Sequence, residues 1–311
     1  MNRHLSPLLA PLVVAGVLVP AIYLTAVLDR ALHARVAGRR LHAGELFMAP
    51  AREAAFLLLQ QRARTERSDA EAWALAPALL ASLAAVALAA APLGPSLAVA
   101  DAQSGIVLFG AAVALVMVAV FLNGWAPNSF FPLVGAYRFV AMALSYEMPF
   151  ALVLIAAALP AQSLAVGALV EAQAGLWNVA RQPLGLPIYL VTALGIGFWG
   201  PLNLSDAADL AGGTRAELSG AALLLWRAAR GAVLVAVAAM GAAVFLGGWR
   251  GPWLPGPAWM ALKTVGLLVV LLAAGHLLPR VRQERFVWFA WVVLIPLALV
   301  DIFLSGLLLL L

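Results

Sequence analysis

The residue best placed to do chemistry in this sequence is Glu147, which interrupts a long apolar segment. The apolar run begins at Arg138, and a helix rising 1.5 Å per residue would carry Glu147 about 14 Å further along its axis. An ionisable group near the middle of a membrane costs several kcal/mol when unpaired, so it usually faces a bundle interior or a hydrated path. The position therefore indicates proton or ion handling. The alternative is a structural carboxylate that is fixed by Arg138 or another buried donor.

The composition places this glutamate in a membrane protein. Of the 311 residues, 65% are hydrophobic and only 11% are charged, and the mean hydropathy is +1.00. A water-soluble fold of this length needs far less apolar surface. The chain has no cysteine, and its four histidines lack metal-ligand spacing. These facts exclude thiolate metal sites and iron–sulfur ligation, and we expect no metal site in this chain.

Apolar runs of about 20 residues predict an all-α fold, a polytopic transmembrane bundle of about eight helices in one integral membrane domain, 1–311. The expected spans are roughly 7–28, 72–92, 106–123, 136–160, 184–200, 221–247, 257–278 and 286–311. The fifth is the shortest. The intervening loop 29–71 is too charged to cross a bilayer. Its segment 44–61 has one apolar face, with Arg52 and Glu53 opposite, which predicts an amphipathic helix in the interface or against the bundle.

The placement of basic residues predicts the orientation of the chain. Fifteen of the nineteen arginines and lysines fall on one side of the expected spans. Cytoplasmic loops retain positive charge, so we expect both termini outside the cytoplasm of a multi-pass protein in the cell inner membrane. The loops 29–71 and 201–220 would then face the cytoplasm. The net charge of +5 is explained by topology and does not indicate nucleic-acid binding.

Many short motifs in order resemble the membrane subunit 1 family of respiratory complex I, the NADH-quinone oxidoreductase. The resemblance covers nearly the whole chain, 28–311. The residues that carry it are Gly124-Trp125-Ala126, Asn128, Gly135, Arg138, Leu144-Ser145-Tyr146-Glu147, Gln173, Trp177-Asn178, Glu217, Ser219-Gly220, Gly247-Gly248-Trp249, Gly251-Pro252, Ala261-Leu262-Lys263-Thr264, Leu278-Pro279-Arg280, Arg282, Trp291 and Pro296-Leu297.

This resemblance implies a membrane subunit of a proton-translocating NADH-quinone oxidoreductase, which forms part of the quinone chamber and links quinone reduction to proton transfer. Quinone would be the substrate. NADH, FMN and iron–sulfur clusters are expected in partner subunits, so the chain would catalyse nothing alone. Its expected partners are other subunits of the membrane and peripheral arms, together with the lipid bilayer.

The resemblance also suggests site residues. Glu147 would act as a proton relay, and Asp206, Asp209 and Glu217 would belong to an acidic loop that borders the quinone chamber.

Three further residues are assigned to the quinone chamber by the same resemblance. Asp29 and Arg30 follow the first span, where family members usually have Glu-Arg, and Glu53 matches an acidic residue of the amphipathic helix. A charge pair at a helix end needs no function, because exposed pairs contribute little to stability. For Glu53 the structural alternative is a solvated helix face.

The chain departs from the family pattern at several charged positions. Neutral residues replace acids at Ile196, Asn203 and Ala208, and replace bases at Phe56, Trp199, Gly275 and Val292. Acids and bases are both lost from the same buried regions, as expected when ion pairs disappear together. Deleting both partners of a buried pair can be nearly neutral, whereas deleting one strands a charge.

Two other functions stay open. The chain could be the equivalent subunit of a membrane-bound hydrogenase or other donor-linked oxidoreductase, although its 201–210 spacing resembles complex I instead. It could also be a structural membrane anchor that has lost the quinone and proton chemistry, which the missing charges favour.

We expect smaller roles for the remaining charged residues of the spans. Lys263 could pair with Asp301, but snorkelling to the interface is the stronger expectation. Arg227 and Arg230 are interpreted as cytoplasmic anchors of the sixth span. Because they share the arginine-rich side, the 44–61 helix and the 201–220 loop are expected to meet the peripheral arm together.

Overall fold

The computed structural model of this chain describes residues 9–39, 42–95, 99 and 102–308. Within these ranges the regular structure consists of α-helices joined by short 3-10 and π turns. The ends of the chain, 1–8 and 309–311, lie outside the described residues. The predicted location of both termini therefore stays a prediction.

Seven helices in the described ranges are long and apolar enough to cross a membrane, which confirms the predicted polytopic bundle. They are α1 (Ala10–Val36), α3 (Ala70–Ala89), α4 with α5 (Gly105–Ala114 and Val116–Trp125), α6 (Phe130–Ala158), α10 (Gly220–Phe245), α11 (Gly256–Leu277), and α12 with α13 (Gln283–Phe289 and Ile295–Leu308). The last of these is continuous through a π-helical turn, Ala290–Leu294. Pro296 follows this turn and has no N–H to donate, which explains why the helix widens there.

The fifth predicted span forms a shorter helix than we expected. It is α9 (Gly185–Ile196), whose 12 residues rise only about 18 Å against the roughly 30 Å of a bilayer core. The chain then leaves the helix at Phe198, which has a left-handed φ of 36°. The 3-10 turn η2 (Gly200–Leu202) follows at once.

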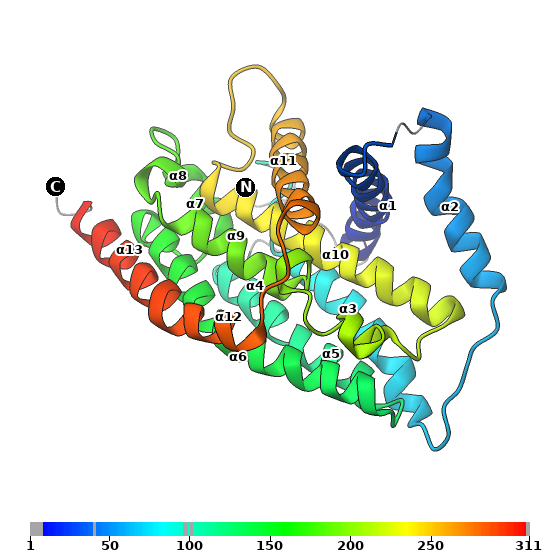
Figure 1. Cartoon of the computed structure of the whole chain (residues 1–311). Helices are drawn as coiled ribbons and strands as arrows, with labels where there is room; N and C mark the ends of the chain where they lie inside the picture. Colours follow the sequence, from blue (N-terminus) through cyan, green and yellow to red (C-terminus); the bar gives the residue numbers. More distant parts are fainter. Residues whose placement is uncertain (1–8, 40–41, 96–98, 100–101, 309–311) are drawn as a thin grey trace.

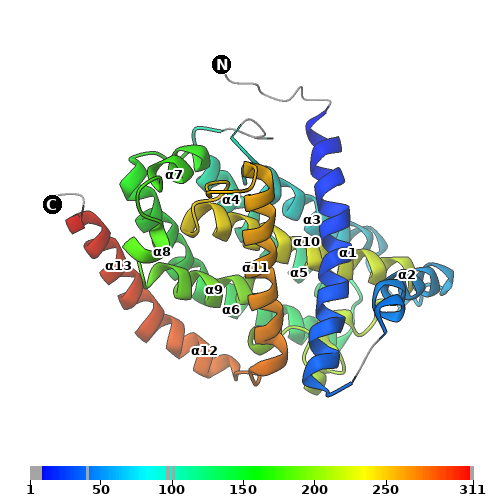
Figure 2. The same cartoon turned by 90° about the horizontal axis from the view of Figure 1, so that it is seen from above.

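Helix α10 is the centre of the bundle. It is the yellow helix that runs through the middle of Figure 1, and 94% of its membrane-spanning window is buried. Its inner residues are mostly alanine, valine and glycine, which let neighbouring helices approach closely. α1, α3, α9 and α11 all pack against it, and α1 also lies beside α11 (Figure 2).

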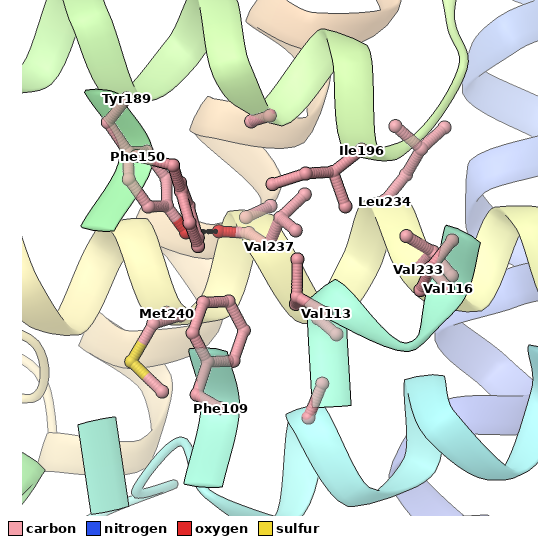
Figure 3. Packing of buried hydrophobic residues seen from close by; sticks show 14 of the residues in the cluster. Phe109, Val113, Val116, Phe150, Tyr189, Ile196, Val233, Leu234, Val237 and Met240 are labelled. Carbon is pink, nitrogen blue, oxygen red and sulfur yellow. Dashed lines mark hydrogen bonds between the residues drawn. The ribbon is translucent and has the colours of Figure 1, made fainter. Parts of the chain in front are cut away.

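An aromatic contact ties three of these helices together. Tyr189 of α9 stacks on Phe150 of α6, with ring centroids 5.6 Å apart and an interplanar angle of 29°. Its hydroxyl donates a hydrogen bond to the carbonyl of Val237 in α10 at 2.7 Å, the dashed line in Figure 3. The phenol therefore buries its ring without stranding its polar atom.

The amphipathic helix is present as α2 (Ala43–Leu59), which packs against α1 and α10 at one edge of the bundle (Figure 1). Leu57 is its buried residue, while Phe56, Leu58 and Leu59 stay exposed. Glu53 makes ion pairs toward the bundle while its side chain stays 41% exposed, so the solvated-face alternative stays open.

The two ends of the bundle differ in their connecting segments. At the arginine-rich end, defined by 29–71 and 197–220, the chain forms the 3-10 turns η2, η3 (Ala208–Leu210) and η4 (Gly213–Arg215). At the opposite end, defined by 159–184 and 246–255, it forms η1 (Leu159–Ala161), α7 (Val166–Ala172) and α8 (Asn178–Arg181).

Candidate functional site

Asp206 is the best-partnered acid at the arginine-rich end. Its side chain is 0% exposed, and Thr214 Oγ1 donates to Oδ1 at 2.5 Å. Oδ2 faces two guanidinium groups, with Arg215 Nε at 2.9 Å and Arg230 Nη1 at 3.6 Å. A buried carboxylate needs such partners, because an unpaired one costs several kcal/mol.

Glycines shape the loop that carries this acid. The carbonyl oxygen of Ser205 would lie 1.7 Å from a Cβ at Gly213, whose φ is +55°, and 2.5 Å from a Cβ at Gly135. Only glycine accommodates both the backbone contact and the left-handed conformation at position 213. Thr214 N then donates to Ser205 O at 3.1 Å, and Asn123 Nδ2 donates to Thr214 O at 2.9 Å. The loop is thereby fixed to α5 and α6.

Arg230 lies inside the protein, so its interpretation as a cytoplasmic anchor was wrong. Its guanidinium donates to the carbonyls of Gly197, at 3.2 Å, and Phe198. The Cζ atom stands 4.6 Å from the Phe198 ring centroid and 4.7 Å from that of Trp199. Cation–π contacts and carbonyl acceptors thus supplement its longer ion pair with Asp206.

Asn203 completes this arrangement as a neutral group. With its amide oriented to satisfy both neighbours, its oxygen accepts from Arg230 Nη2 at 3.3 Å and its nitrogen donates to Phe198 O at 3.1 Å. An amide can serve both a donor and an acceptor, which a carboxylate cannot.

Glu53 joins three helices through two ion pairs. Its carboxylate pairs with Arg30 of α1 and with Arg227 of α10. The predicted grouping of Arg30 and Glu53 is therefore present in space. Arg227, which we interpreted as an anchor, also pairs with Glu53, and its anchor role and the assignment of Arg30 and Glu53 to a quinone chamber stay predictions.

Asp29 contacts a different helix from its sequence neighbour. Its Oδ1 lies 2.7 Å from His276 Nε2 in α11, and the His276 ring centroid lies 5.5 Å from that of His33. Asp29 thus connects α1 to α11, whereas Arg30 connects α1 to α2. The contacts do not join Asp29 directly to Glu53.

Asp209 and Glu217 occupy the edges of the acidic loop. Arg138 Nη1 donates to Asp209 Oδ2 at 2.8 Å, and the Asp209 side chain is 60% exposed. The hydrogen bond from Arg138 holds the pKa of Asp209 below its ordinary value. Glu217 Oε1 accepts from Ser129 Oγ at 3.0 Å. Neither acid is part of the Asp206 network.

Glu147 is half-buried in α6, next to the fully buried Tyr146. Arg138, its suggested structural partner, pairs with Asp209 instead. Among the described residues, no hydrogen bond or ion pair to the Glu147 carboxylate is found. Leu144 and Met148, on the same stretch of helix, are exposed. Its role as a proton relay stays a prediction.

An apolar cavity that sequence reasoning missed lies between α9, η2 and α12. It has a volume of about 740 Å³, and its walls include Leu194, Leu202, Leu278, Phe286 and Phe289. These residues come from three separate segments, so no local sequence signal could have indicated it. Glu284 and Arg285 also line it, but its exposed lining is almost entirely apolar.

Comparison with known proteins decides the family of this chain. A family model described as NADH dehydrogenase matches residues 9–306. A relative from Rhodopseudomonas palustris (strain BisB5) is 34% identical over 240 residues, which is 77% of this chain and 75% of the relative. The chain belongs to the NADH dehydrogenase family.

Other relatives of this family member agree with that result. A protein from Cereibacter sphaeroides (strain ATCC 17029 / ATH 2.4.9) is 33% identical over 252 residues, covering 80% of this chain and 79% of the relative. One from Geobacter metallireducens is 32% identical over 260 residues, with the same coverage. All three relatives are named as the H-type subunit of NADH-quinone oxidoreductase, so the predicted family is confirmed.

Two departures of this NADH dehydrogenase family member are neighbours in space. A Cβ at Gly275 would lie 2.4 Å from Trp199 Nε1. The indole therefore fills the space that glycine leaves open, at two positions where basic residues were expected. The two side chains thus fit each other closely without a charge at either position.

Lys263 is the single lysine of the chain. We expected its side chain to snorkel to the interface, but it is only 8% exposed, and it does not pair with Asp301 either. Its Nζ donates to the carbonyls of Leu246, Gly248 and Arg250 at 2.6, 2.9 and 2.6 Å. The Trp177 ring centroid lies 4.3 Å from the same nitrogen. The ammonium group thus caps the C-terminal end of α10, where carbonyl groups lack helical partners.

In the part of the chain that the structure describes, no group of three or more His, Asp or Glu side chains is placed to hold a metal ion. The arrangement pairs charges at the arginine-rich end and offers an apolar space beside them.

Proposed function

We propose that this chain is the H-type membrane subunit of a proton-translocating NADH-quinone oxidoreductase, where it forms part of the quinone chamber and links quinone reduction to proton transfer. The observation that carries the proposal is the likeness over residues 9–306 together with relatives that are named as this subunit. NADH, FMN and iron–sulfur clusters belong to partner subunits in this proposal. The chain itself supplies walls, charges and acids.

The ion pairs at the arginine-rich end support a chamber there. Reduction of a quinone adds electrons and protons to its headgroup oxygens, so the surrounding protein must offer donors near an apolar entrance. Arg30 and Glu53 supply charged groups between α1 and α2, and Asp29 with His276 supplies a group that can carry a proton. The acidic loop with Asp206, held rigidly by its partners, forms a wall of the same end.

Glu147 supports the link to proton transfer. A carboxyl group without a fixed counter-ion can bind or release a proton without breaking an ion pair. Helix α6 carries it away from the arginine-rich end, because Arg138, which pairs with the acidic loop, lies nine residues earlier. This location supports the proposal that Glu147 is the first relay acid inside the membrane.

Contacts between α2, its following loop and the start of α10 support a common docking face for the peripheral arm. Ala63 N donates to Ser219 Oγ at 2.7 Å, and Gly220 N donates to Gln60 Oε1 at 3.3 Å. These bonds join the 44–61 segment to the end of the 201–220 loop. We place this face in the cytoplasm, since arginine is concentrated on it.

A structural anchor is the second candidate, favoured by the packing of Trp199 on Gly275. At this place an apolar contact replaces the charges of the family pattern. An anchor would preserve the assembly while the quinone and proton chemistry was lost.

The test is purification of the assembled complex through a tag on this chain, followed by assay of NADH-quinone turnover and proton uptake in vesicles. We expect both activities. Copurification of a nickel hydrogenase subunit, or an assembled complex without quinone turnover, would contradict the proposal.

A matched pair of variants on α2 refines the test. Glu53→Gln breaks two ion pairs and is expected to raise the KM for quinone several-fold. Glu45→Gln changes an exposed acid of the same helix and should leave the KM unchanged. Equal behaviour of the two variants would remove Glu53 from the proposed chamber.

A further inference from the structure

Asp301 of α13 is a buried acid that the proposed function does not use. It is only 1% exposed, in a helix that is long and apolar enough to cross a membrane. Both carboxyl oxygens are inaccessible, and no hydrogen-bond donor of the described residues reaches either of them. This contrasts with Asp206, which has three partners.

The surroundings of Asp301 are built to fit it closely. A Cβ at Gly185, the first residue of α9, would lie 3.1 Å from Asp301 Oδ2. The same hypothetical atom would lie 3.6 Å from the Cβ of Gln182 and 2.9 Å from Phe245 Cε1. Glycine therefore keeps open the space that the carboxyl group occupies, and Gln182 borders it.

Two further buried oxygens without donors belong to α8 and to the residue that follows it. Gln182 and Asn178 are both fully buried, and their amide nitrogens donate to the carbonyls of Ala156, at 2.6 Å, and Val244, at 2.8 Å. Within the described ranges their side-chain oxygens, Gln182 Oε1 and Asn178 Oδ1, have no donor. The region thus contains hydrogen-bond acceptors and lacks hydrogens to give them.

The charged and titratable groups nearby do not neutralise Asp301. α13 packs against α6, α9, η1 and the π-helical turn η5, which holds no titratable residue. On α6, Arg138 is paired at the far end, and Glu147, beside Tyr146, lies nine residues before Ala156, about 14 Å along the axis.

The other titratable groups near Asp301 are either bound to another group or make no ion pair with it. On α9, Tyr189 donates to Val237, and no titratable residue lies in η1. Arg181, next to Gln182 in the sequence, makes no ion pair in the described structure, and Lys263 is held by three carbonyls.

Elementary electrostatics then decides the protonation of this group. An ionised carboxylate in this place would be a buried charge without a counter-ion or a hydrogen-bond donor among the described residues, which is unfavourable. A protonated carboxylic acid carries no charge and avoids this cost.

We propose that Asp301 is a proton-binding site, a carboxylic acid that holds its proton in the resting protein in a closed space bordered by Gly185, Phe245 and Gln182. The site lies toward the end of the bundle opposite the arginine-rich end. It stands independently of the proposed quinone chemistry, since it rests only on burial and on the missing donors.

The test is infrared spectroscopy of the purified complex at about pH 7, where exposed carboxyl groups are ionised. Subtracting the spectrum of Asp301→Asn from that of the unchanged protein should reveal the carbonyl band of one protonated carboxyl group per chain. Asp209→Asn is the matched control, because Asp209 is exposed and paired with Arg138. Its difference spectrum should contain no such band.

The Asn variant is expected to assemble, because asparagine keeps the size of the side chain and carries no charge. If it does not assemble, Asp301→Glu keeps the acid, and its band should be present but displaced. A difference spectrum of Asp301→Asn with only ionised-carboxylate bands would overturn the proposal. Disappearance of the protonated band on addition of sodium chloride, but not of choline chloride, would overturn it in favour of a metal-cation site.

Discussion

The two ends of the bundle hold their charges in different ways. At the arginine-rich end the buried acid Asp206 has cationic partners in Arg215 and Arg230. At the opposite end Lys263 is bound by backbone carbonyls, and Asp301 has no donor among the described residues. Opposite charges neutralise one another at the first end, whereas single groups are isolated at the second.

This difference determines what a change of protonation would cost. Protonating one member of an ion pair strands its buried partner, so paired groups resist titration and mainly hold the structure together. A proton that moves on an isolated group breaks no ion pair. Glu147 lies between the two ends and also has no ion-pair partner among the described residues. For this reason it is a better relay candidate than the paired acids.

The largest effect is expected from breaking the Asp206 network. Asp206→Asn removes the charge that balances Arg230 in a buried site, and such a loss typically costs about 3–5 kcal/mol. The thermal transition of the solubilised complex should fall markedly. Asp209→Asn in the same loop, which loses only an exposed pair, should change it little. Equal effects of the two variants would contradict the contrast between buried and exposed pairs.

Removing the isolated cation tests the opposite end. Lys263→Met leaves three carbonyls without their donor, and we expect a destabilisation of about 3 kcal/mol. Hydrogen exchange at 246–250 should increase, while Thr264→Ala, which loses one intrahelical bond, should leave it unchanged. Amine-reactive reagents should label the single lysine only after unfolding. Rapid labelling of the folded chain would show that the ammonium group is solvated.

We expect an intermediate loss of stability from disturbing the packing of Trp199 on Gly275. Gly275→Ala would press a methyl group against the Trp199 indole at 2.4 Å, and overpacking of this kind costs about 1–3 kcal/mol. The double variant Gly275→Ala with Trp199→Phe should recover most of the loss. Gly266→Ala in the same helix, with nothing within 4 Å, serves as the control. If the destabilisation of the double variant equals the sum of the two single effects, Trp199 and Gly275 are not in contact.

The smallest effect is the pH dependence of the exposed pair. Because Arg138 lowers the pKa of folded Asp209, the pair stabilises the fold above the unfolded pKa, about 3.9, and this stabilisation is lost as pH falls through the folded pKa. Exposed pairs contribute about 0–1 kcal/mol. In Asp209→Asn the free energy of unfolding should therefore fall slightly less steeply as the pH is lowered. A steeper fall in this variant would contradict the predicted loss of the pair's stabilisation at low pH.

The membrane helices could be predicted from the sequence, because apolar length alone decides whether a segment can span. The amphipathic character of α2 was also predictable, since its periodicity is local. The length of α9 was not, because Phe198 leaves the helix through a left-handed conformation that hydropathy does not report. Motif order indicated the family, which global similarity then confirmed.

The site was only partly predictable for a related reason. Glu53 and Arg227 are 174 residues apart, and nothing in either local pattern indicates their contact. Arg230 resembles an anchor because it lies near the start of a span, yet the unwound backbone at 197–198 offers carbonyls that hold it inside. Partners of charged residues in a bundle depend on tertiary packing, which spacing does not specify.

The most direct test of the account is the number of protons translocated per electron by the complex that carries Glu147→Gln, reconstituted in vesicles. The variant should assemble and reduce quinone, but it should move fewer protons per electron than the unchanged complex. Glu171→Gln, which alters an exposed acid of α7, should behave like the unchanged protein. An unaltered proton-to-electron ratio in Glu147→Gln would contradict the claim that this unpartnered acid relays protons.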